Sequence, residues 1–279
     1  MTMHERRMRK YDQNIARSVG RMADRVREPV PFCWFCTAAS GQRSKEHIFP
    51  RWLLKHLGAE KEMVEPVRIS LPAGGIVASK RGARPLQAHV NGEVCASCNN
   101  GWMNDLEVAV RPLLSQLPQR GQMTRAEAEV LARWFIKVAV NLNVSQPYRL
   151  LIPEADRHEL STSIPPRFAV DLFRARRQDG CFDWIQGASV GFLLPSTLSV
   201  ERLRSVCERT LSTNIRVTDL VARVIYLPAP LLAEKLVPAT DATTIWPLPS
   251  KMPFWSKIPR HDDYMQGRII DYNAPLMWT

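Results

Sequence analysis

The chain has 279 residues, of which 45% are hydrophobic and 23% charged, as in a globular protein with a sizeable core. These proportions exclude a fully disordered, collagenous or disulfide-scaffold chain, and the length allows one or two domains. Lys and Arg number 38 against 27 Asp and Glu, so the formal net charge is +11, which favours a polyanionic partner.

No apolar run approaches the ~18 residues of a membrane-spanning helix. The first thirty residues carry eight Lys or Arg and no continuous apolar stretch, so they do not resemble a secretory signal. We therefore expect a cytoplasmic protein without a membrane partner. In a reducing compartment its six cysteines need a role other than disulfides.

Segment 1–30 is predicted to form a basic amphipathic helix that ends at Pro29 and Pro31. Its apolar stripe recurs at steps of three and four residues. The stripe consists of Met8, Tyr11, Ile15, Val19, Met22 and Val26. The Arg and Lys residues on the other faces are either solvated or lie along a phosphate backbone.

Segment 31–117 holds two Cys-x-x-Cys pairs and little helical pattern before Gly101, except over 50–57. Alternation of apolar residues between Val67 and Val90 predicts a β-hairpin. Just beyond it, Lys80, Arg81 and Arg84 form a basic loop that is either solvated or holds DNA. Helical pattern then runs from Gly101 to Leu117.

Segment 118–164 is predicted to be helical. Thr124 and Glu127 form a capping box, and the apolar stripe that follows is typical of a core-facing helix. That stripe consists of Leu131, Trp134, Phe135, Val138 and Leu142. A short helix is expected within 153–163.

Segment 165–227 is predicted to be a smaller α+β domain with strands over 168–173, 182–194 and 215–227 and a helix over 199–211. Segment 228–279 holds eight of the 21 prolines and three tryptophans, which predicts an extended Pro-rich tail that is ordered in patches.

The two cysteine pairs predict a structural zinc site. Cys33, Cys36, Cys95 and Cys98 are spaced as two chelating pairs, and four thiolates suit tetrahedral Zn²⁺. The redox alternative expects a thioredoxin-like βαβ setting, which surrounds neither pair. Zinc saturated by four thiolates has no open position, so its role would be structural. The isolated Cys181 and Cys207 are expected to be buried small hydrophobes.

The zinc would bring two polar segments together, and here the sequence resembles a family. Cys-x-x-Cys, then Glu46-His47-Ile48-x-Pro50, then Cys-x-x-Cys followed at once by Asn99 and a helix, is similar to the HNH (His-Me finger) nucleases in their zinc-braced form. The pattern spans 33–107. The run 99–107, followed by a helix with Trp134 and Lys137, also resembles uncharacterised bacterial and phage HNH proteins.

The resemblance implies an α+β fold with a zinc-braced ββα-metal finger and a divalent-cation site. His47 matches the general base, Glu46 takes the place of the usual Asp metal ligand, and Asn99 matches the second ligand. Glu for Asp is a departure from the family pattern, and Asp105 or Glu107 is an alternative carboxylate. The long insertion between His47 and Cys95 is a second departure.

The chemistry explains why these residue types belong together. A neutral imidazole can deprotonate water near neutral pH, and carboxylate and amide oxygens suit Mg²⁺ or Mn²⁺. These residues have alternative roles. Asn99 as a helix N-cap is one, with Asn100 as the cation ligand instead. Lys45 and Arg51 as solvated cations are another.

Further polar residues fall nearby in the sequence. His89 and Asn91 lie in the predicted second strand and are candidates to orient His47. His56 is expected to be structural, and Trp102, Met103 and Leu106 are expected to face the core.

The sequence therefore predicts a metal-dependent HNH endonuclease that hydrolyses DNA phosphodiester bonds with a His base and one divalent cation. The alternative is a non-catalytic zinc-finger protein that binds nucleic acid. The sequence does not distinguish DNA from RNA as the substrate. It also leaves open the structure of that substrate and whether the protein is a homodimer.

Overall fold

The computed structural model describes residues 33–36, 42–65, 67–70, 77–80, 82–116, 121–146, 149–175, 182–188, 211–227 and 242–261. The helix predicted for 1–30 lies outside this part of the chain. So do Cys181, Cys207 and the helix predicted over 199–211, apart from Leu211, which begins a strand.

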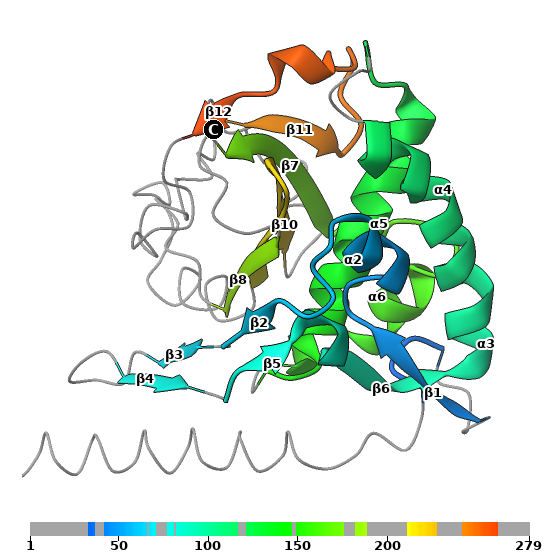
Figure 1. The fold of residues 1–279 in the computed structure, drawn as a ribbon. Coiled ribbons are helices and arrows are strands. Elements are labelled where there is room, and N and C mark those ends of the chain that lie inside the picture. Colours follow the sequence, from blue (N-terminus) through cyan, green and yellow to red (C-terminus); the bar gives the residue numbers. More distant parts are fainter. Residues whose placement is uncertain are drawn as a thin grey trace, which may run out of the picture.

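Helix α5 (Arg125–Asn143) lies between a β-sheet on one side and helix α4 (Asn104–Gln116) on the other (Figure 1). The predicted capping box starts it: the Thr124 hydroxyl accepts a hydrogen bond from the Glu127 amide at 3.2 Å, and the Glu127 carboxylate accepts one from the Thr124 amide at 2.8 Å. All five residues of the predicted apolar stripe are buried, so this helix is confirmed together with its core face. No helix in the described part of the chain combines the length and apolar character needed to cross a membrane.

The large sheet is almost entirely antiparallel. Its strand order is β11-β7-β10-β9-β8, and β12 pairs in parallel with β7. The strands are β7 (Phe168–Ala175), β8 (Phe182–Ala188), β9 (Leu211–Val217), β10 (Leu220–Tyr226), β11 (Thr243–Trp246) and β12 (Arg260–His261).

One predicted strand is wrong in detail. The apolar run 215–227 is not a single strand, because the chain reverses at Thr218 and Asp219 and pairs β9 with β10. Thr218 adopts a left-handed φ of 56°. The Asp219 carboxylate accepts a hydrogen bond from Arg174 Nε at 2.7 Å, which ties the turn to β7.

The Pro-rich tail contributes to the same sheet within 242–261. Its strands β11 and β12 both pair with β7, and the 3₁₀ turn η5 (Trp255–Lys257) connects them. Buried residues of the cysteine-bearing segment and of the sheet belong to one hydrophobic cluster, so the described core continues across the predicted boundary at 164/165.

The cysteine-bearing segment contains small sheets and short helices. Strand β1 (Arg43–His47) pairs antiparallel with β6 (Val90–Cys95), and helical turns lead from β6 into α4. The predicted hairpin is confirmed as the pairing of β3 with β4. The remaining elements of this segment are α2 (Arg51–His56), β2 (Met63–Val64), β3 (Val67–Ser70), β4 (Val77–Lys80), β5 (Arg84–Pro85), η1 (Leu86–Ala88), α3 (Ala96–Cys98) and the π-helical turn η2 (Asn99–Met103). Two further short elements, η4 (Arg149–Leu151) and α6 (Glu154–Glu159), follow α5.

The fold class is mixed α+β, as the sequence predicts. The helix predicted from Gly101 to Leu117 begins earlier, at Ala96, and is kinked at Gly101, whose ψ is −116°. The short helix expected within 153–163 is α6.

Candidate functional site

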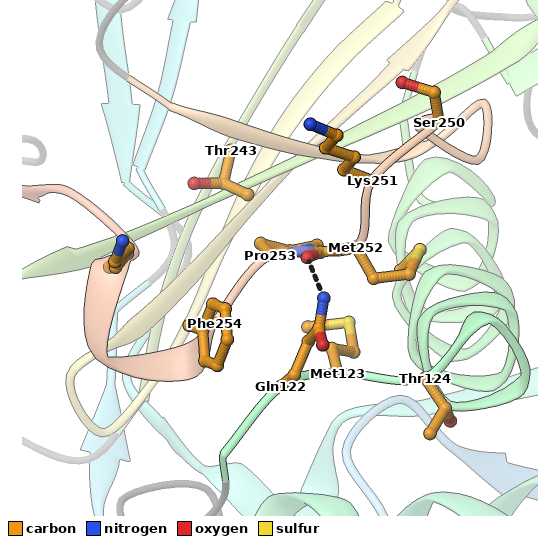
Figure 2. Close-up of a pocket in the computed structure, with 10 residues that line it drawn as sticks. Gln122, Met123, Thr124, Thr243, Ser250, Lys251, Met252, Pro253 and Phe254 are labelled. Atoms are coloured by element: carbon orange, nitrogen blue, oxygen red, sulfur yellow. Dashed lines mark hydrogen bonds between the residues drawn. The ribbon is translucent and has the colours of Figure 1, made fainter.

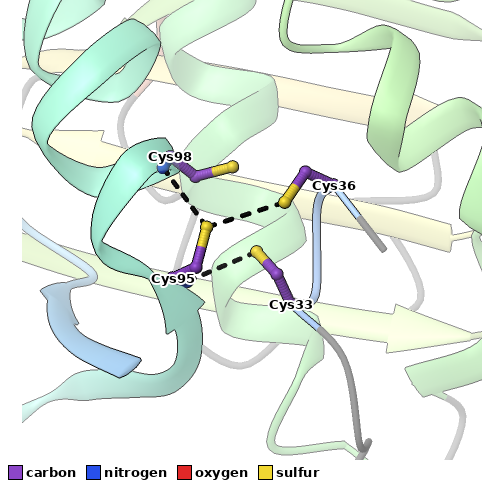
Figure 3. Close-up of side chains that lie close together, drawn as sticks. All are labelled: Cys33, Cys36, Cys95 and Cys98. Carbon is purple, nitrogen blue, oxygen red and sulfur yellow. Dashed lines mark hydrogen bonds between the residues drawn. The ribbon is translucent and has the colours of Figure 1, made fainter. Parts of the chain in front are cut away.

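Four cysteine sulfurs converge where β6 meets α3. The ligand atoms of Cys33, Cys36, Cys95 and Cys98 all lie within 4.8 Å of one another. The Cys36 and Cys95 sulfurs are 3.6 Å apart, close to the roughly 3.8 Å expected between two sulfurs of a tetrahedral zinc site. Figure 3 shows the four side chains pointing toward a common centre.

Backbone amides also point at these sulfurs. Cys33 Sγ accepts hydrogen bonds from Cys95 N at 3.3 Å and from Phe35 N at 3.5 Å, and Cys95 Sγ accepts one from Cys98 N at 3.4 Å. The hydrogen bond between the Cys33 and Cys98 side chains, helped by backbone donors to Cys33, lowers the pKa of Cys33 to about 4 and raises the pKa of Cys98. Because thiolate is the form that binds metal, these four cysteines could hold a metal ion such as zinc.

The first cysteine pair is fixed from outside the cluster by Trp34. The Trp34 amide donates to Glu93 O at 2.7 Å, and the Trp34 carbonyl accepts from Arg157 Nε at 2.9 Å. The Arg157 guanidinium also lies 3.7 Å from the centroid of the buried Trp34 ring. These contacts attach the 33–36 turn to β6 and α6.

His47 is the last residue of β1 and is half-buried. The strand register shifts between Ser44 and Glu46, and His47 then pairs with Val90 of β6. Burial lowers the pKa of the His47 imidazole, and the positive charge of Arg51 lowers it further. A neutral imidazole is the form that a general base requires.

The Glu46 carboxylate has a different partner from the predicted one. It is buried and forms an ion pair with the ammonium of Lys137 in α5. Glu107 of α4 binds the same ammonium, with Lys137 Nζ 2.8 Å from Glu107 Oε1. We call Glu46, Lys137 and Glu107 the buried ion cluster.

Burial shapes the pKa values within this cluster. By itself burial lowers the pKa of Lys137, but the two carboxylates more than offset it, so that its pKa is raised above the ordinary value. Burial raises the pKa of Glu46, against the opposing effect of Lys137.

Asn99 is the first residue of η2, directly after α3; it is half-buried, has helical backbone angles and is not the N-cap of the helix. That position belongs to Cys95, whose sulfur accepts from the Cys98 amide. Asn100 and Asp105 are exposed. Between described residues the structure records no hydrogen bond or ion pair that joins Asn99 to Glu46 or His47.

Among the described residues the predicted cation ligands therefore make no direct bond to one another. Within the described ranges, the four cysteines are the one group of three or more His, Cys, Asp or Glu residues whose ligand atoms lie together. The assignment of Glu46 and Asn99 to a catalytic cation stays a prediction.

Two of the other polar residues singled out from the sequence, Asn91 and His89, have structural partners. The amide of Asn91, which is buried, donates to Asn141 of α5 at 2.9 Å. The ring of His89 lies edge-on to Trp184, and its carbonyl accepts from the Ile48 amide at 3.0 Å. His56, Lys45 and Arg51 are exposed.

The expected core face of the helix after the cysteines is confirmed. Met103 and Leu106 are buried, and Trp102 is partly buried with its ring 5.4 Å from that of Phe35.

Sequence reasoning missed Lys137 as a site residue. A signal was present, because Lys137 stands between Ile136 and Val138 within a helix whose residues are otherwise predominantly apolar, and a charge there needs a buried partner. Its partners, Glu46 and Glu107, are distant in sequence, so only the fold identifies them.

A separate pocket of about 750 Å³ lies near the start of α5 (Figure 2), and neither the cysteines nor His47 line it. Residues from 122–124 line one side, and the segment from Ser250 to Lys257 lines the other. Gln122 Nε2 donates to Met252 O at 2.9 Å, which connects the two walls. The pocket contains no residue predicted to act in catalysis.

Comparisons of the chain with family models, curated proteins and solved structures find no match.

Proposed function

We propose that the protein is a metal-dependent endonuclease of HNH type that hydrolyses phosphodiester bonds in DNA, with His47 as general base. The single observation that carries this proposal is the local order of elements. An antiparallel pair, β1 with β6, leads directly into a helix, and His47 ends the first strand. That ββα order is what the resemblance to HNH nucleases implies.

The environment of His47 supports the role of base. The imidazole is half-buried and its pKa is lowered, so the neutral form predominates at physiological pH. Arg51 and Lys45 are exposed beside it and offer positive charge to the neighbouring phosphates of a substrate.

The proposed cation is Mg²⁺ or Mn²⁺, with Asn99 and Glu46 as its oxygen ligands and Glu107 as the alternative to Glu46. When bound, it would neutralise charge on the scissile phosphate and the leaving oxygen. Glu46 and Glu107 bring two carboxylates, the ligand type that Mg²⁺ and Mn²⁺ prefer, to one place beside β1 and α4. The four cysteines are proposed to hold a structural Zn²⁺.

The test is cleavage of supercoiled plasmid DNA with Mg²⁺ or Mn²⁺. Wild type should nick the plasmid, and His47→Ala should lose at least about a hundredfold in rate, because general bases contribute about 10²–10⁴. His56→Ala is the matched control, since His56 is exposed at the end of α2. DNA binding by wild type without any cleavage would favour the alternative of a non-catalytic zinc-finger protein.

A further inference from the structure

Three charged side chains from three elements meet next to His47. Lys137 of α5 is fully buried and binds Glu46 of β1 and Glu107 of α4. Removing charges from water is costly, and apolar residues of similar volume often serve stability as well or better. A fully buried lysine at this position therefore indicates a role other than stabilising the fold.

The cluster joins the two parts of the proposed site. Glu46 directly precedes His47, and Glu107 lies in α4, the helix that follows Asn99 after the kink at Gly101. A single ammonium on α5 thus holds both the strand end that carries the proposed base and the helix that carries the proposed ligand.

A second contact holds the same strand pair against α5. Asn91 faces Glu46 across the β1–β6 ladder, and its side chain binds Asn141, one turn beyond Lys137. Both strands are therefore attached to one face of α5 by polar side chains, which fix direction more closely than apolar packing does.

We propose that Lys137 is a positioning residue: through Glu46 and Glu107 its ammonium sets the place of His47 relative to the helix that begins at α3. This inference rests on the proposed function. It predicts that loss of the ammonium lowers the rate of the chemical step and leaves the affinity for DNA unchanged.

The experiment measures plasmid cleavage at saturating Mg²⁺ for wild type, Lys137→Met, Lys137→Arg, Glu46→Gln and the double variant K137M/E46Q. Lys137→Met should lower kcat by at least about tenfold with KM unchanged, as for residues that orient catalytic groups. Lys137→Arg, which keeps the charge, should recover part of that loss. Glu129→Gln, on an exposed position of α5, is the control.

The double variant keeps the test valid if Lys137→Met folds poorly, because it leaves no unpaired charge at Glu46. Because Lys137 acts through Glu46 as well as Glu107, Lys137→Met should lower kcat less in the Glu46→Gln background than in wild type, so the double variant should lose less than the product of the two single losses. The role of Lys137 would be overturned if the loss of kcat in the double variant equalled the full product of the two single losses. It would also be overturned if a folded Lys137→Met protein kept the wild-type kcat. An inactive wild type would instead overturn the proposed function, and the positioning role with it.

Discussion

Hydrogen bonds from main-chain amides prepare the cysteine cluster for a metal ion. Phe35 N and Cys95 N donate to Cys33 Sγ, and Cys98 N donates to Cys95 Sγ. If a metal ion holds the four cysteines as thiolates, such donors would lower the repulsion among their negative charges. Because the amides belong to the same short turns as the cysteines, the local fold and the proposed zinc site depend on each other.

Replacement of one ligand should therefore affect both metal content and stability. Cys98→Ser should lose zinc, because a neutral hydroxyl is a poor ligand, and should lower the melting temperature by at least about 5 °C. Metal analysis and thermal denaturation measure the two effects. Ser97→Ala, an exposed neighbour in the same turn, should change neither. A Cys98→Ser protein with full zinc content and unchanged melting would contradict the proposed zinc site.

At the scale of elements, α5 organises the molecule, because the sheet and α4 pack on opposite sides of it and the buried ion cluster is built on it. Its first turn is fixed by the reciprocal hydrogen bonds of Thr124 and Glu127. Loss of the cap should cost stability without touching the proposed active site, which lies several turns away along the helix.

Thr124→Ala should lower the free energy of unfolding by about 1 kcal/mol, because the Glu127 amide loses its acceptor. Chemical denaturation measures this loss, and plasmid cleavage at a temperature well below melting should remain at the wild-type rate. Ala126→Gly is a useful comparison at an exposed position of the same turn, where a similar loss is expected from helix propensity alone. No change in stability for Thr124→Ala would mean that the capping box is not formed in solution.

Helix α5 could be predicted because its signals are local in sequence, whereas contacts between distant segments could not be predicted from local patterns. The capping box and apolar stripe of α5 lie within one stretch of sequence, as does the spacing of the cysteines. The turn at Thr218 and Asp219 was missed because it contains neither Gly nor Pro, and the apolar pattern continues on both sides. The pairing of β11 and β12 with β7, and of Lys137 with Glu46 and Glu107, joins distant segments that no short motif connects.

At the scale of the whole molecule, the positive charge is the feature most relevant to a partner. The formal net charge is +11. Several acidic groups are already neutralised inside the fold, among them Asp171 by Arg223 and Asp219 by Arg174. Each of these ion pairs uses one basic group for one acidic group, so the excess of Lys and Arg remains, and it favours a polyanion such as the proposed substrate.

If DNA is that polyanion, affinity must fall as salt rises, because each phosphate contact releases condensed counterions. A protein that contacts about six phosphates loses about a thousandfold in affinity between roughly 50 and 200 mM salt. Anisotropy of a labelled duplex without divalent cations measures this dependence. His47→Ala should show the same slope as wild type, since a neutral imidazole releases no counterion, and this separates binding from catalysis. Affinity that does not change with salt would contradict a role for the net positive charge in binding DNA, whatever the activity of His47.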